Sequence, residues 1–100
     1  MTNFYSDETK KLFEAILLLD NEEECRSLFE DICTVKELLD LSQRLHIARL
    51  LKDGISYHEI SEKTGASTTT ISRVNRCLNY GSGGYKTVLE KLEKRENMDK

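Results

Sequence analysis

Hydrophobic residues recur every three or four positions along most of the chain, which is the period of an amphipathic helix. The segments 6–19, 21–32 and 34–52 each begin at a Ser, Asn or Thr that can cap the first free backbone N–H groups. Asp53 and Gly54 end the third segment. No stretch alternates in the way that a β-strand requires. The pattern therefore predicts an all-α fold.

The segment 56–78 predicts two short helices joined by a tight turn. Ser56 and Glu59 have the spacing of a capping box, and Ser67 can cap a second helix. Between the two helices, Gly65 needs a positive φ to reverse the chain within three residues, which glycine adopts most easily. We expect helices over 57–63 and 68–78 with the turn 64–66 between them. This arrangement is typical of a helix-turn-helix.

The two short helices separate inward from outward side chains. The spacing turns four apolar residues toward the crossing of the helices: Ile60, Ile71, Val74 and Leu78. The outer face then carries Thr69, Thr70, Arg73 and Arg76. Hydroxyl groups at a helix start can approach base edges in the major groove, and arginines can reach phosphates or guanine. This face therefore predicts binding to double-stranded DNA.

Three glycines within 81–84 interrupt the helical pattern, and a last amphipathic helix is expected over 84–95. A charged, flexible tail is expected over 96–100. One hundred residues are enough for one domain, so we expect a single domain over 1–100. Within it, the helices of 6–53 are expected to form a dimer interface.

The charge of the chain is unevenly distributed. The net charge is −3. Residues 1–41 carry four basic and eleven acidic groups, whereas residues 42–80 carry six basic and three acidic groups. The basic surplus therefore lies on the predicted DNA-binding segment, as attraction to phosphate requires. Three surplus charges per protomer are modest, and they predict strong salt sensitivity of DNA binding only if two protomers act together.

Several classes of site are disfavoured by the residues present. The three cysteines, Cys25, Cys33 and Cys77, show no CxxC spacing, and neither His46 nor His58 completes a zinc pattern with them. Cys25 and Cys33 fall on apolar helix positions, so we expect reduced, buried thiols there. We expect no metal and no cofactor. The first residues do not resemble a secretory signal, and no apolar run is long enough to span a membrane. A cytoplasmic protein with no membrane partner is expected.

The apolar stripes of the first three helices are broad for so short a chain. Leu17–Leu19, Leu38–Leu39 and Leu50–Leu51 widen them beyond a single face. A monomer could bury these residues internally. A helix-turn-helix protein usually binds DNA as a two-fold dimer, however, and such a dimer needs an apolar interface. A homodimer is the favoured interpretation.

The stretch from Leu41 to Ile60 (LSQRLHIARLLKDGISYHEI), followed by Thr64 to Leu78 (TGASTTTISRVNRCL), resembles the Trp repressor superfamily. With the following Asn79–Tyr85 (NYGSGGY) it resembles the YerC/YecD-type branch of Trp-repressor-related proteins. The similarity covers about residues 41–92. It implies a multi-helical protomer, an intertwined homodimer and recognition helices inserted into successive major grooves.

The resemblance also assigns roles to individual residues. It implies that the base-facing end of the recognition helix is formed by Ser67, Thr68, Thr69 and Thr70. It implies contacts to the DNA backbone from Tyr57, His58, Ser61 and Ser72. Together with Arg73 and Arg76, these residues are the expected DNA-binding set.

The chain departs from the Trp repressor at the co-repressor pocket. By resemblance, Arg73 matches an arginine that holds tryptophan, and Arg44 matches a second one if a one-residue gap is allowed. In the Trp repressor a glycine follows the first arginine and makes room for the indole. Here Val74 follows instead. We expect a possible effector pocket around Arg44, Arg73 and Val74 that does not take tryptophan, with the effector itself unknown.

Two other functions compete with a DNA-binding transcriptional regulator, for which repression is favoured over activation. One is a helical protein-interaction module without direct DNA readout, which the low net basicity supports. The other is an enzyme. His46, His58 and Cys77 would have to converge with an orienting group to form a nucleophilic site, and the sequence gives no sign of this. No catalytic residue is therefore predicted.

Overall fold

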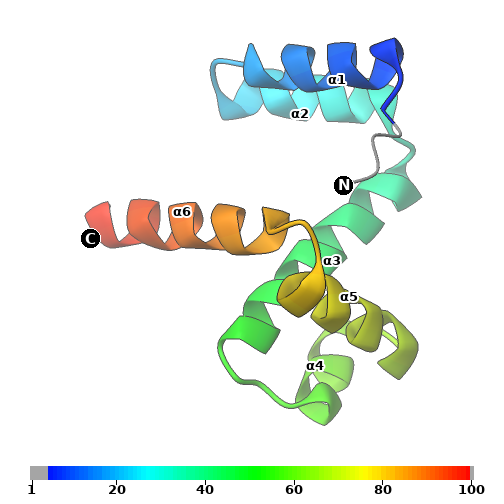
Figure 1. Ribbon diagram of the computed structural model, residues 1–100, viewed down its shortest axis with the longest axis vertical. Helices are drawn as coiled ribbons and strands as arrows, with labels where there is room; N and C mark the ends of the chain where they lie inside the picture. The colour runs from blue at the N-terminus through cyan, green and yellow to red at the C-terminus, as the bar shows by residue number, and fades with distance from the viewer. Residues whose placement is uncertain (1–4, 100) are drawn as a thin grey trace. The chain divides into compact units, whose positions relative to one another are not determined.

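The computed structural model of the protein describes residues 5–99, and every regular element in this range is an α-helix. The helices are α1 (Asp7–Leu17), α2 (Glu22–Ile32), α3 (Val35–Lys52), α4 (Tyr57–Thr64), α5 (Thr68–Tyr80) and α6 (Gly84–Met98) (Figure 1). The prediction of an all-α fold is confirmed. No helix of the described residues is long and apolar enough to cross a membrane.

Side-chain caps fix where the first five helices begin. Four cap residues each accept a hydrogen bond from the backbone N–H three positions later: Ser6, Asn21, Ser56 and Ser67. Thr34 and Glu37 form a reciprocal capping box, in which Thr34 Oγ1 accepts from the Glu37 N–H at 3.1 Å and a Glu37 carboxylate oxygen accepts from the Thr34 N–H at 2.8 Å. Hydrogen bonds from the Thr34 backbone N–H and from the Thr34 side chain hold the pKa of the Glu37 carboxylate below its ordinary value. The predicted helix starts are confirmed at all five positions.

The chain divides into two compact units, residues 1–38 and 39–100, with the boundary inside α3. In the described part of the first unit no residue is buried. Several large apolar side chains there are exposed, among them Leu17, Leu18, Ile32 and Val35. Cys25 and Cys33 are only half-buried, contrary to expectation, because this unit has no core that could enclose them. The prediction of one domain over 1–100 stays a prediction.

The second unit contains the hydrophobic core. Its buried residues are Ile47 and Ala48 of α3, Ile60 of α4, Ala66 of the turn, Ile71, Val74 and Leu78 of α5, and Leu89 of α6. All four residues predicted to face inward are therefore buried. Helix α5 packs against both α4 and α6, so its inner face is the centre of the unit (Figure 1).

Two ion pairs join α6 to the C-terminal end of α3. Arg49 pairs with Glu96, and Lys52 Nζ lies 3.2 Å from a carboxylate oxygen of Glu93. The hydrogen bonds that Arg49 donates to Glu96, together with the negative charge of that carboxylate, raise the pKa of Arg49. Helix α6 continues through Met98, where the sequence predicted a tail from residue 96, because Glu96 has a partner on α3. Residue 100 lies outside the described residues.

The link between α4 and α5 depends on a left-handed glycine. Gly65 has a φ of +75°, as expected, and its N–H donates to the Ser61 carbonyl oxygen at 2.8 Å. A Cβ built at this position would meet no atom within 4 Å. Conformation rather than crowding is therefore what makes glycine necessary here.

We expect Gly65→Ala to lower the free energy of unfolding by about 1–2 kcal/mol, because alanine is strained at positive φ. Chemical denaturation followed by circular dichroism measures this change. Gly84→Ala is the matched control, since Gly84 begins α6 without a positive φ and also has open space around it. An equal effect of the two substitutions would contradict the role assigned to Gly65.

Candidate functional site

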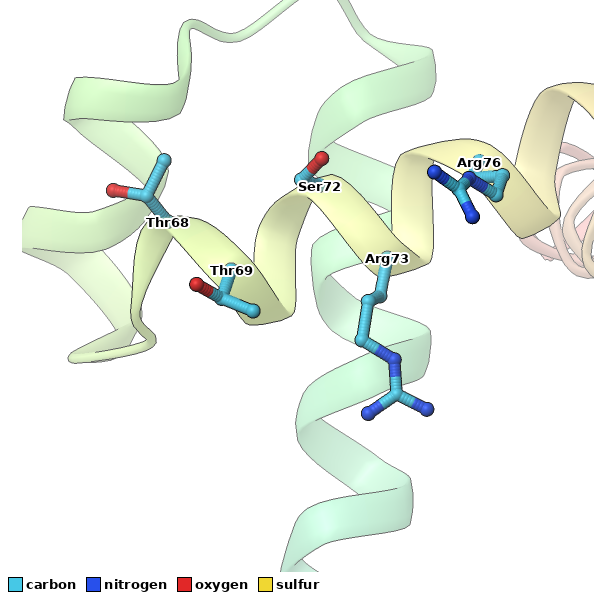
Figure 2. A pocket seen from close by; sticks show the side chains of 5 residues that line it. All are labelled: Thr68, Thr69, Ser72, Arg73 and Arg76. Carbon is cyan, nitrogen blue, oxygen red and sulfur yellow. The ribbon is translucent and has the colours of Figure 1, made fainter.

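The outer face of α5 forms a shallow hollow of about 360 Å³. Its lining residues are Thr68, Thr69, Ser72, Arg73 and Arg76, and all five are exposed (Figure 2). Figure 2 shows the threonine hydroxyls at the start of the helix and the two guanidinium groups further along it. All five belong to the predicted DNA-binding set. They share one face because Ile71, Val74 and Leu78 turn the opposite face into the core.

The start of α5 is electrostatically suited to an anion. Ser67 Oγ accepts from the Thr70 N–H at 3.1 Å and lies 3.1 Å from the Thr70 hydroxyl, so the cap also holds this threonine. Thr70 is half-buried, whereas Thr68 and Thr69 are exposed. No acidic residue lies in the first turn. The positive end of the helix dipole is therefore not neutralised by a carboxylate.

The two arginines of α5 have no acidic partner among the described residues. Lys11, Arg26, Arg49 and Lys52 all form ion pairs. Within the described residues, neither Arg73 nor Arg76 does. An unpaired, exposed guanidinium can bind an external phosphate or carboxylate without first breaking an internal pair.

The α4 residues of the predicted set lie in two different environments. Tyr57 and His58 are exposed, and His58 Nε2 lies 3.1 Å from a carboxylate oxygen of Glu62. Ser61 is half-buried and donates its hydroxyl hydrogen to the Ala66 carbonyl oxygen at 2.9 Å. This hydroxyl therefore has a role inside the turn that the sequence did not reveal.

A second cavity, of about 300 Å³, lies beside α5. It is lined by Arg44, Thr70, Arg73, Val74, Cys77 and Tyr85. The three residues of the predicted effector pocket thus surround one space. Val74 is only 3% exposed, so its side chain belongs mainly to the core and contributes one wall of the cavity.

Cys77 and Tyr85 are lining residues that the sequence analysis missed. Cys77 lies one helical turn after Arg73, so helical spacing could have identified it. Tyr85 follows the glycine break, and only the direction of α6 brings it to this cavity. Burial raises the pKa of Tyr85, the nearby Cys77 raises it further, and Arg44 opposes the shift.

An apolar groove of about 580 Å³ runs between α3 and the junction of α5 and α6. Its lining residues are Leu45, Cys77, Gly81, Ser82, Gly84, Tyr85 and Val88. Among residues 5–99, no cluster of three or more His, Cys, Asp or Glu side chains is arranged to hold a metal ion. The features of the second unit are thus a cationic helix face, a small polar cavity and an apolar groove.

Comparison with known proteins gives consistent matches over most of the chain. The family model described as Trp repressor protein matches residues 7–93. Uncharacterized protein YerC of Bacillus subtilis (strain 168) is 49% identical over 89 residues, which cover 89% of this chain and 86% of that protein. The crystal structure of a TrpR like protein from Eubacterium eligens ATCC 27750 is 51% identical, covers 88% of this chain and 91% of its own, and has a TM-score of 0.84. A second crystal structure, of a putative Trp repressor from Staphylococcus aureus, is 45% identical, covers 89% of both chains and also has a TM-score of 0.84.

Proposed function

The chain belongs to the Trp repressor family, and from this membership we propose that it is a sequence-specific, double-stranded DNA-binding transcriptional regulator. It acts in the cytoplasm as a repressor rather than as an enzyme. Helices α4 and α5 form the helix-turn-helix, and α5 enters the major groove. The observation that carries this proposal is the outer face of α5, with its acid-free first turn and two unpaired arginines.

The chemistry of this face suits the two kinds of contact that DNA recognition needs. Short hydroxyl side chains at Ser67, Thr68, Thr69 and Thr70 stand at the N-terminal end of α5, where a recognition helix contacts base edges. Arg73 and Arg76 lie one and two turns further along the helix and reach phosphate oxygens or guanine.

Contacts to the DNA backbone are proposed for Tyr57, His58, Ser61 and Ser72. The exposure of Tyr57, His58 and Ser72 supports this assignment. Ser61 has the weakest support of the four. Its hydroxyl hydrogen is donated within the turn, and a phosphate oxygen can only accept a hydrogen bond.

We propose a homodimer in which the exposed apolar surface is covered by a second copy of the chain. The first unit buries no described residue and exposes Leu17, Leu18, Ile32 and Val35. Monomeric proteins rarely leave large contiguous apolar patches exposed. Two protomers also double the modest basic surplus and allow recognition of two half-sites about one helical turn apart.

The cavity beside α5 is proposed as an effector pocket that disfavours tryptophan. Arg44 and Arg73 supply positive charge for an anionic group. Val74 occupies, by resemblance, the position where the Trp repressor has a glycine that makes room for the indole. Thr70 and Arg73 line this cavity and belong to the proposed DNA-binding set. A ligand bound here would therefore touch residues used for recognition.

The DNA-binding role is tested by selecting bound sequences from a random duplex pool and measuring affinity between about 50 and 200 mM salt. We expect Arg73→Ala and Arg76→Ala to weaken binding and to reduce the salt slope by about one for each phosphate that is no longer bound. Thr70→Ala should instead change the preferred sequence. Arg26→Ala is the matched control, because it removes the same charge from the first unit.

If Arg73→Ala and Arg76→Ala reduce DNA affinity no more than Arg26→Ala does, the outer face of α5 is not the DNA-binding surface. If the unaltered protein retains no duplex selectively as the salt concentration rises, the DNA-binding proposal fails and the protein-interaction module replaces it.

The dimer is tested by analytical ultracentrifugation, which should give twice the 11.6 kDa of one chain. Ile32→Lys and Val35→Lys should shift the equilibrium toward monomer, because each places a charge in the proposed apolar interface. Met98→Lys is the control, since Met98 is also exposed but lies at the end of α6. A monomer at all concentrations would disprove the interface.

Tryptophan is tested by isothermal calorimetry on the free protein. We expect no binding heat at micromolar concentrations, because Val74 reduces the space for an indole ring. Measurement of DNA affinity with and without millimolar tryptophan provides an independent check. Clear micromolar binding would show that the cavity accommodates the indole despite the valine.

A further inference from the structure

A hydrogen-bond network fixes the turn between α4 and α5. Gln43 Nε2 donates to the Thr64 carbonyl oxygen at 3.0 Å, and this contact joins residues 21 positions apart. Thr64 Oγ1 donates to the Ile60 carbonyl oxygen at 2.7 Å and accepts from the Ala66 N–H at 3.1 Å. Ser61 donates to the Ala66 carbonyl oxygen. Ser61 and Thr64 therefore form hydrogen bonds within the turn, and Gln43 connects the turn to α3.

The Thr64 carbonyl is a group that needs such a partner. It belongs to the last turn of α4, whose carbonyl oxygens have no intrahelical donor. The Ser61 carbonyl is satisfied by the Gly65 N–H, and Thr64 Oγ1 donates to the Ile60 carbonyl, one position earlier. Gln43 supplies a donor for Thr64 from outside the helix.

The helix that carries Gln43 is itself held firmly. Ile47, one turn after Gln43, is completely buried, and so is Ala48. The other contacts of the turn with the core are apolar, through Ile60, Ala66 and Ile71. Apolar packing has little directional preference, whereas a hydrogen bond weakens steeply when its angle changes. The amide of Gln43 is therefore a directional contact that relates the turn to α3.

We propose that Gln43 is a positioning residue for DNA recognition, which sets the direction in which α5 presents its N-terminal hydroxyls. This inference rests on the proposed function of α5. Base contacts depend on placement within fractions of an ångström, whereas attraction to phosphates acts over several ångströms. Removal of the Gln43 hydrogen bond therefore reduces discrimination between sequences more than it reduces non-specific binding. Ser61 supports the same turn from the α4 side.

The test uses the full chain with Gln43→Met, which keeps the length of the side chain but removes the donor, and Gln43→Glu, whose ionised carboxylate can only accept. Ile47→Val is the matched control, because it removes one buried methylene from the same helix and leaves the Gln43 amide in place. Amide hydrogen exchange is measured at Gly65 and Ala66 without DNA. Affinity is then compared between a selected duplex and a scrambled duplex.

We expect Gln43→Met to speed exchange at Ala66 by about three- to tenfold relative to Ile47→Val, with a larger effect for Gln43→Glu. The ratio of selected to scrambled affinity should fall by a similar factor, while the salt slope stays unchanged. The unchanged slope separates positioning from direct contact with phosphate.

Three results would overturn the inference. They are exchange at Ala66 equal to that of the control, an affinity ratio equal to that of the control, or a salt slope that falls with Gln43→Met. If the unaltered protein does not discriminate between duplexes, the proposed function fails instead. The exchange measurement then still decides whether Gln43 orders the turn.

Discussion

Burial of one face of α5 is the constraint on which the rest of the second unit depends. Ile71, Val74 and Leu78 leave solvent almost completely, and this fixes the rotation of the helix about its axis. Once that rotation is fixed, the hydroxyls of the first turn and the guanidinium groups of Arg73 and Arg76 have to lie outside. The packing that stabilises the unit and the face available for DNA are therefore two consequences of the same apolar spacing.

In the described part of the chain, some basic side chains of the second unit form ion pairs within the protein, whereas the arginines of α5 do not. Arg49 and Lys52 are held by the carboxylates of α6, and they join two helices of the unit. Arg73 and Arg76 have no such partner among the described residues. The excess of acid lies in the first forty residues, away in sequence from the proposed DNA-binding helix. A chain with a negative net charge can therefore still present a locally cationic face.

Recognition and regulation would share residues in this protein. Thr70 and Arg73 lie where the outer face of α5 meets the second cavity, so a ligand in that cavity would act on the proposed recognition helix directly. The side chain of Val74 is buried in the core and also forms a wall of this cavity. A single position thus contributes to the stability of the fold and would limit the size of the proposed effector.

The sequence by itself determined the helical elements, the cap residues, the left-handed glycine and the division of α5 into inner and outer faces. These features follow from rules that act within one or two helical turns, as at Thr34 and Glu37. The extent of α6, the approach of Tyr85 to Arg44, and the bond from Gln43 to Thr64 were decided only by the tertiary structure. These contacts join residues 21 to 47 positions apart, where the relative placement of whole helices determines which side chains meet. The short-range pattern therefore predicted the outer face of α5, and the packing of the helices placed Gln43 against the turn that precedes it.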